Sequence, residues 1–506
     1  MTRRFLPIAA VLATGLLLAS CAADSGSGGA SASAEPTAIT IALPAQPPGT
    51  DPILTRSISA WNIYYGIYDG LTRIDATGEV QPGLAEAWES NDDVSEWTFQ
   101  IRPDVTFHDG TPLTAADIVF TYETILASDE STNKAAISMV DTVVATDDST
   151  VVFTLKNPYA AFGSMAATIG IVPQAAYEAA AGQFAANPVG TGPYKYVSQS
   201  DGVDYVVEKN PDYWGEEPDI DSVTFAFVGA EDARVSGVES GTLDIAIIPP
   251  NQVEALAGST TVETATAPGN QVVFLGANSA AGPLANTDLR NAISLAVDRE
   301  AITDALLGGL AEPTGQILAE GVTGYVPGID VPEQDVEEAE MLVASSGYAG
   351  EEITLEFASS GGLARGSEVA QAIEGYLSEI GLNITLVGVD QASFSLKMAN
   401  HEITGLYLNG WAPSVMDGDV VINQLFAGGP EDYAKNADMA ALYIEQQSAA
   451  GAAREAVYEE IDALNTELGL AIPLYTNNYS FAIGSGIDWA PAVDGIYRIA
   501  DISLSE

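Results

Sequence analysis

One segment in the second half of the chain alternates between strand and helix patterns, and it constrains the fold more than any other feature. Strands are predicted at 353–358 and 382–389, and between them Ser367 precedes a helical stretch that Gly381 would end. A strand–helix–strand unit of this kind places its two strands parallel in one sheet with a right-handed crossover. The sequence therefore predicts a mixed α/β fold with at least one largely parallel sheet.

The rest of the chain repeats both patterns. Ile39 and Ile41 alternate with polar neighbours, which is typical of a half-buried strand. Thr114, with Asp117 three residues later, predicts a capped helix over 115–126. Further strands are predicted at 97–101, 151–155, 204–208, 222–228 and 271–277, and further helices at about 288–308, 333–340 and 455–468.

The charge of the chain is strongly acidic, which excludes some partners. Among 506 residues there are 70 Asp and Glu against 17 Lys and Arg, a net charge of -53. Such a surface repels phosphate backbones and anionic lipids, so we expect no nucleic-acid binding. With 47% apolar residues, the chain can bury sizeable cores, and its length suggests roughly three packing units.

Cysteine and histidine are scarce, which restricts metal and catalytic sites. Because Cys21 is the single cysteine, an internal disulfide and Cys-rich metal sites are excluded. His108 and His401 are the two histidines, and we expect His108, at a strand end, to make a structural hydrogen bond. We therefore predict no metal site and no cofactor.

The first residues have the pattern of an export signal. Basic residues Arg3 and Arg4 precede the apolar run 5–18, which is too short to span a bilayer, and small residues then lead to Cys21. This resembles the bacterial lipoprotein signal, which implies cleavage of residues 1–20 and lipid on the Cys21 sulfur. The pattern leaves general secretion and twin-arginine export both open, and an unmodified cysteine behind an ordinary signal is the alternative.

After Cys21 the chain is rich in Ala, Ser and Gly. Residues 21–37 are therefore predicted to be the lipidated cysteine and a flexible tether. We expect a protein outside the cytoplasm that is anchored to the cell membrane through lipid alone.

Several motifs follow one another in an order found in one protein family. The segment 62–126 contains YDGLTR, PGLAEAWE and WTFQIRPDVTFHDGTPLTAADIVFTYE; later come GTGPY at Gly190–Tyr194, NPDYW at Asn210–Trp214, RNAISLAVDREAI and AEMLVASSGY. Together they resemble the family 5 extracytoplasmic solute-binding proteins of ABC importers, the peptide- and nickel-binding group. The resemblance runs from about Ala38 to Glu506.

The resemblance implies an α/β fold of two lobes that close on a ligand like a clamp, with mixed sheets and hinge strands between the lobes. Lobe one would comprise 38–270 with 477–506 and carry an extra subdomain at about 76–185. Lobe two would comprise 271–476. The implied function is ligand capture and delivery to a permease with cytoplasmic ATPase subunits. We expect a monomer without enzymatic activity.

The resemblance also indicates where the ligand would lie. In peptide-binding relatives a Trp is followed three residues later by an Asp that pairs with the peptide ammonium; here Trp411 matches, but Ser414 stands at the Asp position. A hydroxyl cannot replace a buried counter-ion. Either Asp417 or Asp419 takes that role, or the ligand has no ammonium there. The candidate ligand-binding residues are Gln46, Asn270, Asn409, Trp411, Ser414, Asp417 and Asp419, with core packing as the alternative for Trp411.

Other functions stay open at this point. A peptide or related compound is the expected ligand, and an oligosaccharide is the alternative because Ser414 and Trp411 suit a neutral ligand. A nickel carrier would have His401 alone as a nitrogen ligand once His108 is structural. A secreted hydrolase lacks support, since there is no GxSxG, and Gly405 stands where HExxH needs its second His. A structural surface lipoprotein is the last alternative.

Overall fold

The structure is a computed structural model that describes residues 37–505. The predicted signal, Cys21 and the tether to residue 36 lie outside the described residues. Among the described helices, none is long and apolar enough to cross a membrane.

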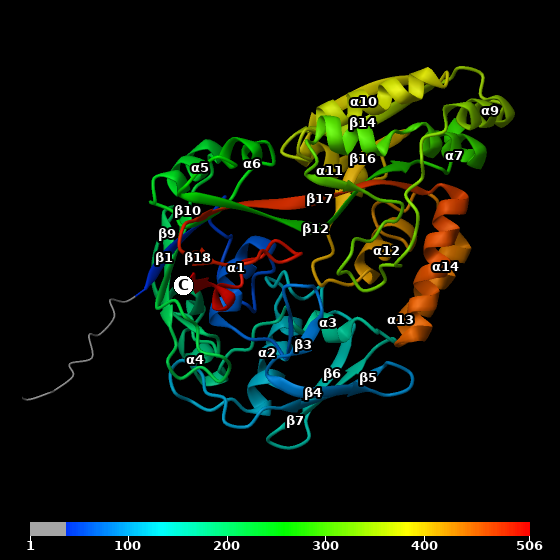
Figure 1. The fold of residues 1–506 in the computed structure, drawn as a ribbon. Coiled ribbons are helices and arrows are strands. Elements are labelled where there is room, and N and C mark those ends of the chain that lie inside the picture. The colour runs from blue at the N-terminus through cyan, green and yellow to red at the C-terminus, as the bar shows by residue number, and fades with distance from the viewer. Residues whose placement is uncertain (1–36, 506) are drawn as a thin grey trace, which may run out of the picture. The chain divides into compact units, whose positions relative to one another are not determined.

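The strands and helices follow one another through the chain in Figure 1. The strands are β1 (Ala38–Leu43), β2 (Thr72–Ile74), β3 (Val80–Pro82), β4 (Ala85–Ser90), β5 (Glu96–Ile101), β6 (Val140–Ala145), β7 (Thr150–Leu155), β8 (Tyr194–Ser200), β9 (Asp204–Lys209), β10 (Ser222–Phe227), β11 (Ile245–Ile247), β12 (Val262–Ala277), β13 (Ala311–Pro313), β14 (Glu352–Ser360), β15 (Asn383–Asp390), β16 (Leu406–Trp411), β17 (Ala471–Gly484), β18 (Ile487–Asp488) and β19 (Ser503–Leu504). The α-helices are α1 (Ile58–Ile67), α2 (Ala115–Ala127), α3 (Phe162–Ala166), α4 (Gln174–Ala179), α5 (Glu231–Glu239), α6 (Asn251–Leu256), α7 (Thr287–Ala296), α8 (Arg299–Ala301), α9 (Val336–Ser346), α10 (Gly366–Glu379), α11 (Gln391–Ala399), α12 (Asp419–Phe426), α13 (Ala437–Ser448) and α14 (Ala452–Leu468).

Two long strands, β12 and β17, join the two halves of the main sheet. The strand order is β15-β14-β16-β12-β17-β11-β1-β10-β9-β8, and β13 pairs with β17. β12 and β17 lie side by side and antiparallel (Figure 1), with a break in register between Pro268 and Val272. One end of β17 pairs with β11, while β16 pairs with the opposite end of β12. We call β8, β9, β10, β1 and β11 the first half of the sheet, and β14, β15 and β16 the second half.

The first half is accompanied by a smaller antiparallel sheet. In the first half, β1 lies parallel to β10 and β11, whereas β9 and β8 continue antiparallel. Strands β4, β5, β7 and β6 form a separate antiparallel sheet in that order. Phe99, Phe153 and Phe162 are fully buried there and contact one another through tilted or edge-on rings. The predicted strands at 97–101 and 151–155 are thereby confirmed as β5 and β7.

The second half contains the predicted strand–helix–strand unit. β14 and β15 are parallel and are joined by α10, and β16 is parallel to β14 on its other side. The apolar face of α10, with Val369, Ile373 and Leu377 buried, packs into the core over these strands. Gly381 has φ +86, a left-handed conformation that few other residues adopt, and the helix ends just before it as predicted.

Local sequence explains most of the helix ends. Thr114 and Asp117 form the predicted capping box, with the Thr114 backbone N–H donating to Asp117 Oδ2 at 3.0 Å. Several predicted boundaries are wrong: α9 ends at Ser346 rather than at residue 340, and α14 begins at Ala452 rather than at residue 455. α10 begins at Gly366, with Arg365 rather than Ser367 before its first residue. The acidic helix predicted from residue 333 begins at Val336, because the Asp335 carboxylate accepts the Glu338 N–H and caps it there.

The helix predicted over 288–308 is interrupted. α7 ends at Ala296 because Val297 adopts an extended conformation, and Asp298 then caps α8 by accepting the Ala301 N–H at 2.8 Å. A π-helical turn follows over Ile302–Leu306. The break buries Arg299, whose Nε donates to the Pro473 carbonyl of β17 at 2.8 Å. A tertiary hydrogen-bond network has therefore overridden the helical periodicity.

Candidate functional site

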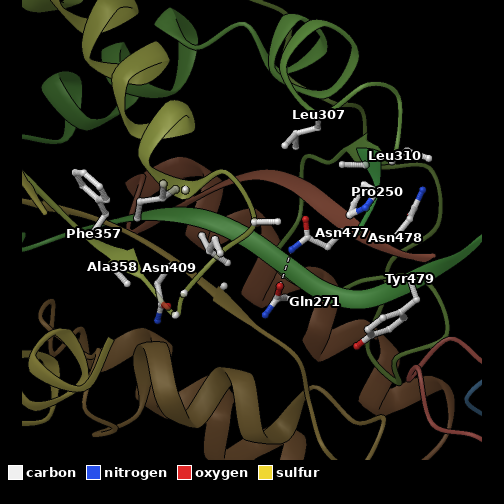
Figure 2. A pocket seen from close by; sticks show the side chains of 18 of the residues that line it. Pro250, Gln271, Leu307, Leu310, Phe357, Ala358, Asn409, Asn477, Asn478 and Tyr479 are labelled. Atoms are coloured by element: carbon white, nitrogen blue, oxygen red, sulfur yellow. Dashed lines mark hydrogen bonds between the residues drawn. The ribbon is translucent and has the colours of Figure 1, made fainter. Parts of the chain in front are cut away.

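A cavity of about 530 Å³ lies where the two halves of the sheet meet. Pro250 lies beyond the end of β11, Gln271 and Asn477 belong to the joining strands, and Phe357 and Asn409 come from β14 and β16. Figure 2 shows Phe357 and Asn409 on one side of this cavity and Pro250 on the other. Both halves of the sheet therefore contribute to one concave site of the size that small-molecule sites usually have.

The wall from the second half lies at the carboxyl ends of its parallel strands. β14 ends at Ser360, and the loop that leads to α10 lines the cavity with Gly361, Gly362 and Leu363. In open α/β sheets, ligands bind in the crevice beyond the carboxyl ends of parallel strands. The strand–helix–strand pattern of the sequence thus positions this part of the wall.

The side chains that line this first cavity are neutral. Of the described residues that line it, none carries a charged side chain, and its polar groups are mainly amides. Asn477 Nδ2 donates to Gln271 Oε1 at 2.6 Å (Figure 2). Asn478 Oδ1 and Ser480 Oγ are buried without a hydrogen-bond partner among the described residues. Buried polar atoms normally have partners, so these two atoms are exceptions in the cavity wall.

A second cavity of about 370 Å³ adjoins the first. The two cavities share Gln391, Phe394, Asn409 and Gly410 as lining residues. The second cavity adds Trp411, Gln424 and Glu431, and Glu431 is the one ionisable residue among the described residues that line it. It follows that a ligand spanning both cavities would meet a neutral region and a single acidic group.

Glu431 is held by neutral donors. Its Oε1 accepts hydrogen bonds from the indole N–H of Trp411 and from Gln424 Nε2 at 3.2 Å, and Asn409 Nδ2 reaches both carboxylate oxygens at 3.2 and 3.3 Å. The residue is 4% exposed. Burial raises the pKa of the Glu431 carboxyl, and the hydrogen bonds from Trp411, Asn409 and Gln424 oppose that rise.

The structure brings two of the sequence-predicted residues into this site. Asn409 lines both cavities, and Trp411 lines the second with a half-buried side chain. Both donate to Glu431. Trp411 thus lines a cavity and also packs against a buried hydrophobic cluster.

Asn270 and Gln46 lie away from these two cavities. Asn270 is 4% exposed, donates from Nδ2 to the Pro413 carbonyl at 3.2 Å, and accepts the Tyr479 hydroxyl at 3.2 Å. It therefore fastens the loop after β16 to the joining strands. Gln46 accepts the Gly202 N–H and lines a separate cavity of about 180 Å³. The structure does not bring Gln46 together with Asn409 and Trp411.

Ser414 contacts a cation. Its Oγ accepts a hydrogen bond from Arg56 Nη2 at 3.1 Å, and Arg56 also donates to Thr168 Oγ1 at 3.0 Å and stacks over Trp61. Burial lowers the pKa of Arg56, and no carboxylate of the described residues lies within 4.0 Å of it. A guanidinium at this position would repel a ligand ammonium.

Asp417 and Asp419 both have partners within the protein. The Arg454 guanidinium donates two hydrogen bonds to Asp417, from Nη1 to Oδ2 at 2.7 Å and from Nη2 to Oδ1 at 2.8 Å. Asp419 Oδ1 accepts from Gln446 Nε2 at 2.6 Å and Gln447 Nε2 at 3.1 Å. Neither aspartate is among the residues that line the two cavities. This geometry gives no support to their predicted role as counter-ions for a ligand.

Sequence reasoning missed Glu431 and Arg56. Glu431 is one of 70 acidic residues and follows Gly-Gly-Pro in a loop between α12 and α13. No spacing rule distinguishes it. The one available signal was Trp411, because an indole N–H that faces a cavity requires an acceptor.

Both histidines make contacts within the protein, and His108 bonds to the GTGPY motif at Gly190–Tyr194. His108 Nε2 bonds the Gly192 carbonyl at 3.0 Å and Nδ1 accepts the Gly190 N–H at 3.3 Å, and burial lowers the His108 pKa to about 4. His401 packs edge-on against Tyr433. Within residues 37–505 there is no group of three or more His, Cys, Asp or Glu side chains that could hold a metal ion.

Comparisons with known proteins agree with this geometry. The family model described as "Bacterial extracellular solute-binding proteins, family 5 Middle" matches residues 79–433. Protein XP55 of Streptomyces lividans is 34% identical over 360 residues, which are 69% of this chain and 64% of that protein, less than two thirds of its length. The probable D,D-dipeptide-binding periplasmic protein DdpA of Escherichia coli is 24% identical over 92% of this chain and 94% of its own.

A solved structure extends the comparison to the fold. The ABC transporter substrate-binding protein CtaP of Listeria monocytogenes superposes with a TM-score of 0.84 at 26% identity, covering 93% of this chain and all of that one. The predicted two-lobed α/β fold is confirmed, and the matched proteins are binding proteins rather than enzymes. The neutral cavity between the halves of the sheet, the family model and the shared fold lead to one conclusion: the chain belongs to family 5 of the bacterial extracellular solute-binding proteins, the ligand-binding components of ABC importers.

Proposed function

We propose that this protein captures a peptide or a related compound in the two adjoining cavities and delivers it to an ABC permease with cytoplasmic ATPase subunits. The observation that carries the proposal is the amide-lined cavity of about 530 Å³, to which both halves of the sheet contribute. Peptide bonds both donate and accept hydrogen bonds, and they match the side chains of Gln271, Asn409 and Asn478.

Movement about β12 and β17 would close the site. We place lobe one at 38–270 with 477–506, including the extra subdomain at about 76–185, and lobe two at 271–476. The register break between Pro268 and Val272 lies at this boundary and supports a hinge there, since a broken ladder bends more easily. Closure of a monomer on its ligand should reduce the radius of gyration in small-angle scattering.

An oligosaccharide is the second candidate, and one observation favours it. The first cavity combines neutral amides with Phe357, Phe394 and Tyr479 and has no charged lining residue among those described. Ser414 in place of an aspartate is also compatible with a neutral ligand. The two candidates differ in one property, since a free peptide carries an ammonium group.

We also propose that the protein acts outside the cytoplasm and is held at the cell membrane by lipid on Cys21. The support is the short apolar run that ends in small residues before the single cysteine. Cells grown with labelled palmitate should incorporate label into this protein, and Cys21→Ser should release it into the medium. An unlabelled protein, or a variant that stays with the membrane, would count against the anchor.

Native mass spectrometry tests the ligand class directly. The soluble chain from residue 22 should retain a co-purified ligand, and mass differences of amino-acid residues would select peptides, whereas hexose or pentose increments would select sugars. The retained ligand, added back at about 100 times its Kd, should stabilise the protein by about 2.7 kcal/mol. A ligand that changes neither the unfolding midpoint nor the scattering would contradict the clamp.

A further inference from the structure

We propose that Glu431 is the counter-ion for a cationic group of the ligand, so that the substrate class is compounds with a free ammonium or guanidinium attached to a neutral polar body. The inference rests on the proposed capture of a solute in the two cavities, and it goes further by naming the group that selects the ligand. It also moves the anchoring carboxylate away from the position of Ser414.

Glu431 has no cationic partner among the described residues. No Lys, Arg or His of residues 37–505 lies within 4.0 Å of the Glu431 carboxylate, whereas the buried Asp417 pairs with Arg454 and the half-buried Asp494 pairs with Arg498. A buried carboxylate without a cation is costly, and neutral hydrogen bonds offset only part of that cost. The raised pKa of Glu431 agrees with an incomplete compensation by the protein.

The geometry provides a place for the cation. Glu431 Oε1 accepts three hydrogen bonds, but Oε2 accepts a single long one, from Asn409 Nδ2 at 3.3 Å. A carboxylate offers about four lone-pair sites over its two oxygens, and the bonds to Glu431 are crowded on Oε1, so Oε2 can accept a further donor. Because Glu431 lines the second cavity, a ligand N–H there can bond to Oε2. Trp411 lines the same cavity, and its indole face can add a cation–π contact.

Other buried acids with neutral partners do not offer such a place. Asp69 and Asp419 are bonded to neutral groups, yet neither lines the two adjoining cavities. Asp462 lines a cavity of about 10 Å³, which is too small for a ligand group. The combination of a cavity, an oxygen with spare capacity and no cationic partner therefore points to Glu431.

The first measurement compares two probes on the wild-type chain. One probe is a library of pentapeptide amides with free amino termini, and the other is the same library after acetylation, which replaces each ammonium group by a neutral amide. Native mass spectrometry and the shift of the thermal midpoint report binding. We expect the free-amine library to bind at least about tenfold more tightly, since a hydrogen bond to a charged group is stronger than one to a neutral group.

The second measurement assigns the difference to Glu431. Glu431→Gln keeps an oxygen for the Trp411 indole and removes the charge, so it should bring the free-amine affinity down to that of the acetylated library. Glu445→Gln, at an exposed position on α13, is the matched control and should bind like the wild type. Equal binding of free-amine peptides by Glu431→Gln and wild type would overturn the proposal. If Glu431→Gln does not fold, equal binding of the two libraries by the wild type still overturns the proposal.

Neutral maltooligosaccharides separate this inference from the proposed function. If the wild type binds them and Glu431→Gln binds them equally well, solute capture stands and the cationic selection is wrong. If the wild type retains no peptide and no saccharide, the proposed function fails, and the role of Glu431 fails with it.

Discussion

Arg454→Met should destabilise the protein strongly, because it leaves a buried carboxylate without its cation. Asp417 is 1% exposed and Arg454 is 7% exposed, and they share two hydrogen bonds of 2.7 and 2.8 Å. The Tyr458 hydroxyl donates to Asp417 Oδ1 at 3.1 Å, and the Asp419 N–H donates to the same oxygen at 2.9 Å. After the change, these two neutral donors would be all that remains around the Asp417 charge.

The expected loss of stability follows from the isolation of the Asp417 charge. Removing one member of a buried ion pair costs about 3–5 kcal/mol, since the remaining charge stays desolvated. Arg454 also bonds to the Gln446 side chain and carbonyl, so the upper part of that range is expected. The double variant Asp417→Asn with Arg454→Met removes both charges and should recover more than about 1 kcal/mol relative to the sum of the two single variants.

Urea unfolding of the soluble chain, followed by tryptophan fluorescence and by circular dichroism, measures the change. Lys134→Met is the matched control, because the Lys134–Asp129 pair is exposed and an exposed ion pair contributes little to stability. Similar small losses for Arg454→Met and Lys134→Met would refute the reasoning. So would a stable Asp417→Asn variant that loses free-amine peptides alone, since Asp417 would then serve the ligand rather than the fold.

Three further predictions concern stability. Burial raises the pKa of Asp462 from 3.8 to about 6, so its ionised form weakens folding above pH 6 and has no effect below pH 3.8. In urea titrations, Asp462→Asn should therefore raise the free energy of unfolding by up to about 3 kcal/mol at pH 8 and by little near pH 4. A gain in stability that does not depend on pH would contradict this. Gly190→Ala should cost about 3 kcal/mol or more in the same assay, because the added Cβ would lie 2.0 Å from the Ile67 carbonyl oxygen, whereas Gly258→Ala, with nothing within 4 Å, should be neutral. Thr114→Ala should lower the free energy of unfolding by about 1 kcal/mol through loss of the α2 cap, and an unchanged midpoint would show that the capping box contributes nothing.

Features that depend on neighbours along the chain could be predicted from the sequence. The alternation of Trp97, Phe99 and Ile101 predicted β5, and Thr114 with Asp117 predicted the start of α2. These predictions hold because periodicity and caps involve residues two to four positions apart. The break after α7 was missed because it depends on a bond from Arg299 to Pro473, 174 positions away.

The family and the two-lobed fold were within reach of the sequence by itself, because ordered motifs along most of the chain carry them. The charges that surround the site could not be predicted from the sequence. Asp417 was a candidate counter-ion for a ligand until the fold placed Arg454 against it. Ser414 received a cationic neighbour from Arg56, 358 positions away. Glu431, one acid among 70 in the sequence, gained its position from contacts with Asn409, Trp411 and Gln424. Whether a carboxylate pairs with the protein or faces a cavity depends on distances of a few ångströms in space, and only the tertiary structure sets those distances.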